Sequence, residues 1–344
     1  MKMSTTTTTG PLHAPANQAA DPLAAYRIEE EPFYRPSGRE VQLYRQAYQH
    51  RMPLILKGPT GCGKTRFVEY MAWALKRPLV TLACNEDMTA SDLVGRYLLD
   101  ADGTAWHDGP LTLAVRHGGI CYLDEVVEAR QDTTVVIHPL TDARRALPLD
   151  KKGEVVHAHP DFQLVVSYNP GYQSSAKDMK PSTRQRFAAL DFDYPAPEIE
   201  ADIVAHETGI APATARSLVS LARSTRELRH RGLDEGASTR MLIYAGLLMR
   251  DGMPVHDSCD MTITSALTDD PDTAAALRQL VEAEFAPEGR APWPSSPLSC
   301  PKSPVSCTRW ACWPAASRAS LSPCRRWPGL RRRARPTPCR RAPC

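Results

Sequence analysis

The chain has 344 residues, a length that predicts two domains on a scale of roughly 100–200 residues per domain. Charged residues make up 24% and hydrophobic residues 42%, as in an average soluble protein. The sequence contains no run of 18 apolar residues, so we expect no transmembrane helix. The N-terminus lacks the apolar stretch of a secretory signal, so we expect a cytoplasmic protein. Residues 1–25 are rich in Thr, Ala and Pro, and we expect them to be disordered.

Residues 26–196 alternate short apolar runs with helical patterns. The runs, which we expect to be strands, cover residues 53–57, 79–83, 120–123, 163–167 and 188–192. Near-continuous apolar strands joined by helices predict a parallel sheet covered on both faces, and therefore an α/β domain. Two further segments, 98–106 and 146–156, place a D-G or K-G turn between apolar runs, which predicts two β-hairpins inserted in this domain.

A phosphate-binding loop follows the first predicted strand and precedes a helix predicted over residues 64–75. It matches the pattern G-x-x-x-x-G-K-[ST] with the residues Gly58, Pro59, Thr60, Gly61, Cys62, Gly63, Lys64 and Thr65. Glycines let backbone N–H groups surround phosphates, and the helix N-terminus adds partial positive charge. We expect Lys64 to contact the β- and γ-phosphates, Thr65 to bind Mg²⁺, and Cys62 to be a small filler.

Polar residues end two later apolar strands. Asp124 and Glu125 follow the strand predicted at 120–123, and Asn169 follows the strand predicted at 163–167. An Asp beside a phosphate loop can hold Mg²⁺, and the adjacent Glu can polarise the attacking water. Because the carboxyl ends of parallel strands meet at the ligand crevice, we expect Asn169 near Asp124, although an Asn-Pro turn alone would give the same pattern.

After residue 196 the pattern changes to helices only. They are predicted over residues 198–206, 214–228, 238–250 and 272–285, and they indicate a small helical domain at 197–286. In the third of these helices we expect the buried face to carry Met241, Ile243, Tyr244, Leu247 and Leu248.

The remaining residues, 287–344, differ in composition from everything before them. They hold 12 of the 31 prolines, six of the ten cysteines and a net charge of +11, so residues 1–286 carry −8 of the total of +3. Three interpretations fit this low-complexity segment: a basic arm that binds a polyanion, a cysteine framework or metal site, and out-of-frame translation of a GC-rich gene. The absence of a C-x-x-C pair argues against the second. Frameshift is the preferred interpretation, so the overall basic charge does not predict a nucleic-acid partner.

Together these motifs resemble those of the AAA+ ATPases of the MoxR type, and within them the CbbQ/NirQ/NorQ group. The resembling segments lie within residues 30–286 and include LKGPTGCGKTRFVEYMA, ICYLDEVVEARQDTTVVIHPL, LVVSYNPGYQ and KPSTRQRFAAL. The resemblance implies a P-loop AAA+ core with a five-stranded parallel sheet in the order 5-1-4-3-2, two pore-facing hairpin inserts and an all-α lid. It also implies ATP and Mg²⁺ as cofactors.

Further roles are implied by the resemblance alone. Asn169 matches sensor 1, Arg186 matches the arginine finger that acts on the neighbouring subunit's nucleotide, and Arg184 lies close enough to share or own that role. Arg240 matches sensor 2 on the lid. The group forms hexameric rings that work with a von Willebrand factor A-containing adaptor on a client, either Rubisco or nitric oxide reductase.

Two functions of different classes follow. The first is an ATP-hydrolysing remodelling chaperone that activates or matures a client enzyme. The second is a nucleotide-dependent binding or regulatory module without productive turnover, for example a DNA-associated regulator, which only the basic tail favours. Glu125, Arg186 and Arg240 argue for the first, because a switch that does not hydrolyse ATP has no need of them.

Overall fold

The computed structural model describes residues 21–100, 103–170, 179–229 and 233–285. The segment predicted as a low-complexity tail, 287–344, lies outside the described residues, and so do residues 1–20. In the part of the chain that the structure covers, no helix combines the length and apolar character needed to cross a membrane.

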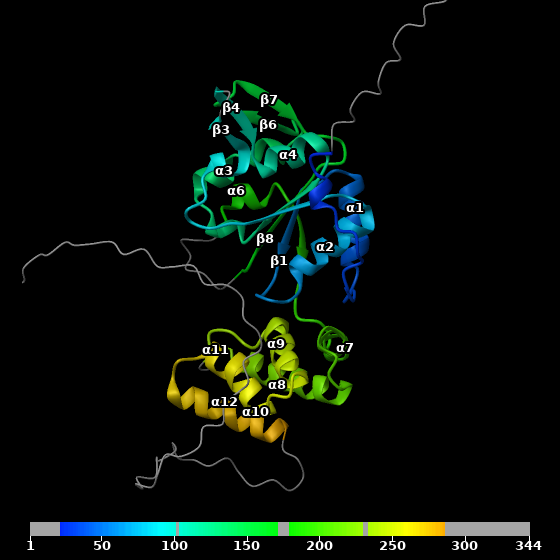
Figure 1. Cartoon of the computed structure of the whole chain (residues 1–344), viewed down its shortest axis with the longest axis vertical. Coiled ribbons are helices and arrows are strands. Elements are labelled where there is room, and N and C mark those ends of the chain that lie inside the picture. Colours follow the sequence, from blue (N-terminus) through cyan, green and yellow to red (C-terminus); the bar gives the residue numbers. More distant parts are fainter. Residues whose placement is uncertain (1–20, 101–102, 171–178, 230–232, 286–344) are drawn as a thin grey trace, which may run out of the picture. The chain divides into compact units, whose positions relative to one another are not determined.

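A five-stranded parallel sheet organises the first half of the described chain (Figure 1). Its strands are β1 (Leu54–Lys57), β2 (Leu79–Ala83), β5 (Ile120–Asp124), β8 (Gln163–Tyr168) and β9 (Ala188–Asp191). They are arranged β2-β5-β8-β1-β9, which is the predicted order 5-1-4-3-2 read from the other edge. Ala83 pairs with Asp124, and Lys57 pairs with both Tyr168 and Asp191, so the carboxyl ends of the strands are in register.

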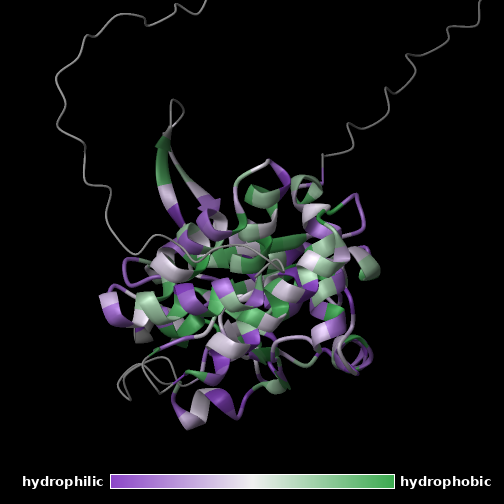
Figure 2. Cartoon of the chain, turned by 90° about the horizontal axis from the view of Figure 1, so that it is seen from below, coloured by the Kyte–Doolittle hydropathy of each residue, from purple (hydrophilic) through white to green (hydrophobic). Residues whose placement is uncertain are grey.

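Helices cover both faces of this sheet, as the apolar strands predict. On one face lie α1 (Glu40–Gln49) and α2 (Lys64–Leu75), which pack Tyr44, Phe67 and Met71 against the sheet. On the other lie α3 (Ala90–Val94) and α4 (Pro110–His117), which contribute Leu93 and Leu111. Figure 2 shows strands in the hydrophobic colour, with helices around them in which hydrophilic and hydrophobic residues alternate.

Both predicted hairpins are present on the α3/α4 side of the sheet. The first pairs β3 (Gly95–Asp100) with β4 (Gly103–Asp108), and the second pairs β6 (Ala146–Leu149) with β7 (Glu154–His157). Short helical segments complete this half of the chain: η1 (Ala24–Tyr26), η2 (Val126–Glu128), α5 (Gln131–Val135), η3 (His138–Leu140) and α6 (Pro181–Arg184).

From Pro197 onward the described chain is helical. The helices are α7 (Pro197–Thr208), α8 (Pro212–Glu227), α9 (Thr239–Arg250), α10 (Val255–Cys259), the π-helical turn η5 (Asp260–Thr264), α11 (Ser265–Leu267) and α12 (Pro271–Glu284). They share a core of their own, centred on Val204, Leu218, Leu242 and Ile263. The domain boundaries at 196/197 and 286/287 stay predictions.

Two expectations require correction. Residues 21–25 were expected to be disordered with the rest of the N-terminus, yet Leu23 is completely buried in the core on the α4 side. In α9 the deeply buried residues are Leu242, Ala245 and Gly246, whereas Tyr244 is 52% exposed. A Cβ atom on Gly246 would lie 2.8 Å from Thr208 Cγ2, so small residues allow α9 to approach α7 closely.

Candidate nucleotide site

The phosphate loop connects the end of β1 to the first turn of α2, as predicted. Lys64 opens α2 and is only 8% exposed. Its Nζ donates hydrogen bonds to the carbonyl oxygens of Gly58 (2.9 Å) and Pro59 (2.8 Å) and to Oδ1 of Asn169 (2.7 Å). Burial lowers the pKa of Lys64, but three acceptors match the three donors of an ammonium group and hold it at the centre of the loop.

The loop backbone requires glycine where it meets the start of α9. Gly61 has a φ of 68°, and a Cβ atom there would lie 2.7 Å from Cβ of Ser238. Any side chain at this position would be both conformationally strained and in collision with its neighbour. The next residue, Cys62, is buried, and burial raises the pKa of its thiol, which fits the predicted role as an unreactive filler.

Hydroxyl groups surround the carboxylate of Asp124 at the end of β5. Thr65 Oγ1 donates to its Oδ2 at 3.3 Å, and the hydroxyl of Tyr122 donates to Oδ1 at 2.8 Å. The hydroxyl of Ser167 donates to the same Oδ1. These contacts fix the orientation of the Asp124 carboxylate and direct its Oδ2 toward Thr65.

Glu125 adopts an unusual backbone conformation, with φ 54° and ψ 48°. Left-handed geometry is uncommon for a residue with a side chain and is typical of functional sites. Its N–H donates to Oγ of Ser167 at 3.0 Å, so one buried hydroxyl contacts both acidic residues. The chain therefore turns sharply after Asp124 and directs the two carboxylates differently.

Asn169 follows β8 and links three parts of the site. Its Oδ1 accepts from Lys64, while its Nδ2 donates to Oγ1 of Thr60 at 3.3 Å and to Oε1 of Glu125 at 3.4 Å. The amide of Asn169 thus spans the distance between the loop lysine and Glu125, the residue that follows Asp124.

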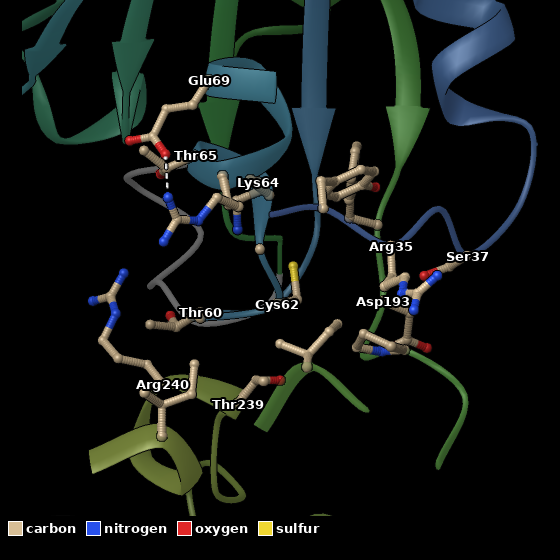
Figure 3. Close-up of a pocket in the computed structure, with 18 of the residues that line it drawn as sticks. Arg35, Ser37, Thr60, Cys62, Lys64, Thr65, Glu69, Asp193, Thr239 and Arg240 are labelled. Carbon is tan, nitrogen blue, oxygen red and sulfur yellow. Dashed lines mark hydrogen bonds and ion pairs between the residues drawn. The ribbon is translucent and has the colours of Figure 1, made fainter. Parts of the chain in front are cut away.

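A pocket of about 660 Å³ opens over these residues (Figure 3). Its size is within the range of roughly 300–1,000 Å³ typical of small-molecule sites. The residues that line it include Lys64, Thr65, Asp124, Glu125 and Asn169. Arg240 from α9 also lines the pocket and extends alongside Thr60.

The two other predicted arginines do not line this pocket. Arg186 lies 3.8 Å from Oδ2 of Asp142, and its side chain is 37% exposed. Arg184 donates from Nη2 to the carbonyl oxygen of Met179 at 3.1 Å. The structure therefore separates both from the nucleotide site of their own chain.

Sequence patterns did not identify several other residues of the site. Tyr122 and Ser167 belong to predicted strands, but no motif distinguishes them from core residues. The segment before α1 contributes Phe33, Tyr34 and Arg35 to the pocket, and Phe33 stacks on His206 of α7 with 3.5 Å between ring centroids. An aromatic and basic cluster in an otherwise polar segment is the signal that could have located them.

Mg²⁺ fits the oxygen donors of this pocket. The ion usually binds one or two protein oxygens and completes its shell with phosphates and water. Thr65 Oγ1 and Asp124 Oδ2 lie close together beside the phosphate loop. Among the described residues no cluster of three or more His, Cys, Asp or Glu side chains could hold a metal by itself, so the ion would need phosphate oxygens as further ligands.

Comparisons with known proteins agree with this geometry. Residues 53–187 match the family described as "AAA domain (dynein-related subfamily)", and residues 200–284 match "CbbQ/NirQ/NorQ C-terminal". The fold and the site thus define an AAA+ ATPase domain with a nucleotide-binding P-loop.

Full-length relatives make the assignment more specific. "Protein CbbQ" of Hydrogenophilus thermoluteolus is 64% identical over 261 residues, which are 76% of this chain and 98% of the relative. "Denitrification regulatory protein NirQ" of Pseudomonas aeruginosa is 56% identical over 74% of this chain and 98% of the relative. "Protein NorQ" of Paracoccus denitrificans is 54% identical over 74% of this chain and 95% of the relative. The chain belongs to the CbbQ/NirQ/NorQ family of MoxR-type AAA+ ATPases.

Proposed function

We propose that the protein is a Mg-ATP-hydrolysing chaperone that assembles into a hexameric ring and activates or matures a client enzyme. The observation that carries the proposal is the chain of contacts from Lys64 through Asn169 to Glu125, beside the Thr65–Asp124 pair. These residues meet in one pocket with the separate tasks of phosphate binding, water activation and metal binding.

Each residue has a distinct part in the proposed reaction. Lys64 neutralises charge on the β- and γ-phosphates, and the backbone N–H groups of the loop bind their oxygens. Glu125 accepts the proton of the attacking water, while Asn169 holds Glu125 and Lys64 in a fixed relation. Mg²⁺, when held by Thr65 and Asp124, offsets the charge of the leaving diphosphate.

An arginine from a neighbouring subunit completes the proposed site. A guanidinium group near the γ-phosphate stabilises the charge that develops during phosphoryl transfer. Arg186 is the first candidate because it is exposed and only loosely paired with Asp142, and Arg184 is the second. Arg240 reaches the nucleotide from the chain's own lid, since it already lines the pocket.

The proposed partners come from the family rather than from the geometry. Relatives named CbbQ, NirQ and NorQ all match over nearly their full length. We propose a von Willebrand factor A-containing adaptor and, as client, Rubisco carrying an inhibitor or nitric oxide reductase awaiting maturation. Recovery of activity by each client, with ATP and the adaptor present, distinguishes them.

ATP hydrolysis measured across a range of protein concentrations tests the proposal. Because neither Arg184 nor Arg186 reaches the pocket of its own chain, turnover per subunit should rise with concentration until rings are complete. Turnover that is constant per subunit would contradict the shared site. Nucleotide binding without hydrolysis at any concentration would instead favour the regulatory module.

A further inference from the structure

Tyr194 connects the phosphate loop to the lid. It lies between β9 and α7, and its hydroxyl donates a hydrogen bond to the carbonyl oxygen of Thr60, at 3.1 Å. The neighbouring Asp193 lines the pocket, whereas Tyr194 does not belong to its lining. No motif marks Tyr194, and no role assigned above includes it.

The geometry of the peptide bond gives this contact a consequence. In a planar trans peptide the carbonyl and the following N–H point in opposite directions. When Tyr194 holds the carbonyl of Thr60, the N–H of Gly61 must point away from Tyr194. Gly61 is the loop residue with φ 68°, a region where glycine can rotate easily, so its peptide needs an external constraint.

Thr60 is also held from the other side. Its Oγ1 accepts the hydrogen bond from Nδ2 of Asn169, the residue that links Lys64 to Glu125. Tyr194 thus fixes the backbone of Thr60, and Asn169 fixes its side chain.

A buried ion pair in the lid holds Tyr194 itself. The guanidinium of Arg226 lies over the Tyr194 ring, 3.6 Å from its centroid. Arg226 makes two hydrogen bonds to Glu200, at 2.7 and 2.9 Å, and a third to the carbonyl oxygen of Ala237. Because Glu200 is completely buried and Arg226 is only 15% exposed, neither side chain has room to rearrange independently.

The same ion pair also reaches the residue beside Arg240. Thr239 Oγ1 donates to Oε1 of Glu200 at 2.6 Å. This hydrogen bond fixes the first turn of α9, which also contains Arg240. Glu200 in α7, Arg226 in α8 and Thr239 in α9 therefore join three lid helices at one point. Arg226 contacts Tyr194, which in turn contacts Thr60. Glu200 contacts Thr239, which precedes Arg240 in α9.

We propose that Tyr194 is a positioning residue that directs the Gly61 N–H toward bound phosphate, and that the Glu200–Arg226 pair transmits the packing of the lid to the loop through it. The proposal rests on the proposed function, because it assumes a nucleotide in this pocket. It goes further by assigning the orientation of one loop peptide to a residue outside the loop.

Tyr194→Phe tests the proposal, because it keeps the ring under Arg226 and removes only the hydroxyl. A neutral hydrogen bond contributes about 0.5–1.5 kcal/mol, so the affinity for ATP and ADP should fall roughly 2- to 12-fold. Without nucleotide, amide hydrogen exchange should be faster in peptides that cover residues 58–63. The thermal midpoint of unfolding should change little, since the ring stays packed.

Tyr48→Phe is the matched control. Its hydroxyl also donates to a backbone carbonyl at 3.1 Å, that of Asp161, but outside the pocket. We expect unchanged nucleotide affinity and unchanged exchange at residues 58–63 in this variant. Equal affinity and equal exchange in Tyr194→Phe and the parent chain would overturn the proposal, and so would equal losses in Tyr48→Phe and Tyr194→Phe.

The two readouts separate this inference from the proposed function. If the parent chain binds neither ATP nor ADP, the proposed function fails, but the exchange experiment without nucleotide still decides whether Tyr194 holds the loop. If the parent binds ATP normally and Tyr194→Phe changes nothing, only the role of Tyr194 is rejected.

Discussion

The phosphate loop and the segment around α6 both carry basic side chains, but they differ in burial and in the number of their hydrogen bonds. Lys64 is buried and makes three hydrogen bonds within its own chain. Arg186 is substantially exposed, and its nearest carboxylate oxygen is 3.8 Å away. A side chain that is already satisfied in one chain suits a site within that chain, whereas a long, weakly held guanidinium is available to another subunit.

Lys64→Ala should produce the largest change in nucleotide binding, and with it the loss of hydrolysis, because it removes the group at the centre of the loop. Each charge-assisted hydrogen bond contributes about 1.5–3 kcal/mol, so losing two from the phosphates should weaken ATP binding roughly 100-fold or more. Equilibrium binding of a fluorescent ATP analogue measures the effect. Lys57→Ala, at the end of β1 beside Asp191, is the control that should bind normally. Equal binding by both variants would contradict the assignment of Lys64.

Arg186→Ala removes the exposed guanidinium group that we propose acts on a neighbouring subunit. It should bind ATP normally but hydrolyse it roughly 10³–10⁵-fold more slowly, as loss of a trans-acting arginine does in comparable enzymes. Arg144→Ala is the matched control, because Arg144 also pairs with Asp142, at 2.6 Å, and is more exposed. We expect its turnover to stay close to that of the parent.

Mixing variants shows whether the arginine acts on a neighbour. At ATP concentrations that just saturate the parent chain, Lys64→Ala subunits stay largely empty but still offer Arg186, and Arg186→Ala subunits offer intact loops. Mixed rings should recover part of the activity that neither variant has alone. If mixed rings form and no activity returns, Arg186 is not the finger, and Arg184 should be tested in the same way.

Glu125→Gln isolates the activation of water within the pocket. An amide cannot accept the proton of water, so hydrolysis should fall roughly 10²–10⁴-fold while ATP binding is retained. Release of phosphate and binding of a fluorescent analogue, measured on the same preparation, separate the two steps. Glu128→Gln, three residues further along, is the control. Normal turnover in Glu125→Gln would remove Glu125 from the mechanism.

The sheet and most of the pocket could be predicted because their residues form recognisable patterns within short stretches of sequence. Apolar runs identified all five strands of the sheet, and the loop pattern with the acidic pair identified Lys64, Asp124 and Glu125. These features depend on residues close together in sequence or on the general rule that parallel strands end at one edge.

The supporting residues could not be predicted because their roles arise from tertiary contacts. Ser167 looks like any polar residue in a buried strand, yet its hydroxyl contacts both Asp124 and Glu125. Tyr194 lies in a short connection with no pattern of its own. Leu23 illustrates the same difficulty in the N-terminal segment, since one apolar residue is enough to fix a few neighbours that composition alone predicts to be disordered.

The smallest effect is expected from ending the chain after Ala286. Helix α12 already supplies Val281 to the helical core and buries Leu277, and the family match ends at residue 284. The composition of 287–344, rich in Pro and Arg without apolar periodicity, predicts no face that could be buried. ATP turnover and the mass of the assembled ring, measured by light scattering, should therefore equal those of the full chain. A shortened chain that fails to fold or assemble would make the tail a structural element. If instead only the full chain binds nucleic acid, in a manner that weakens with salt, the segment is a natural basic arm.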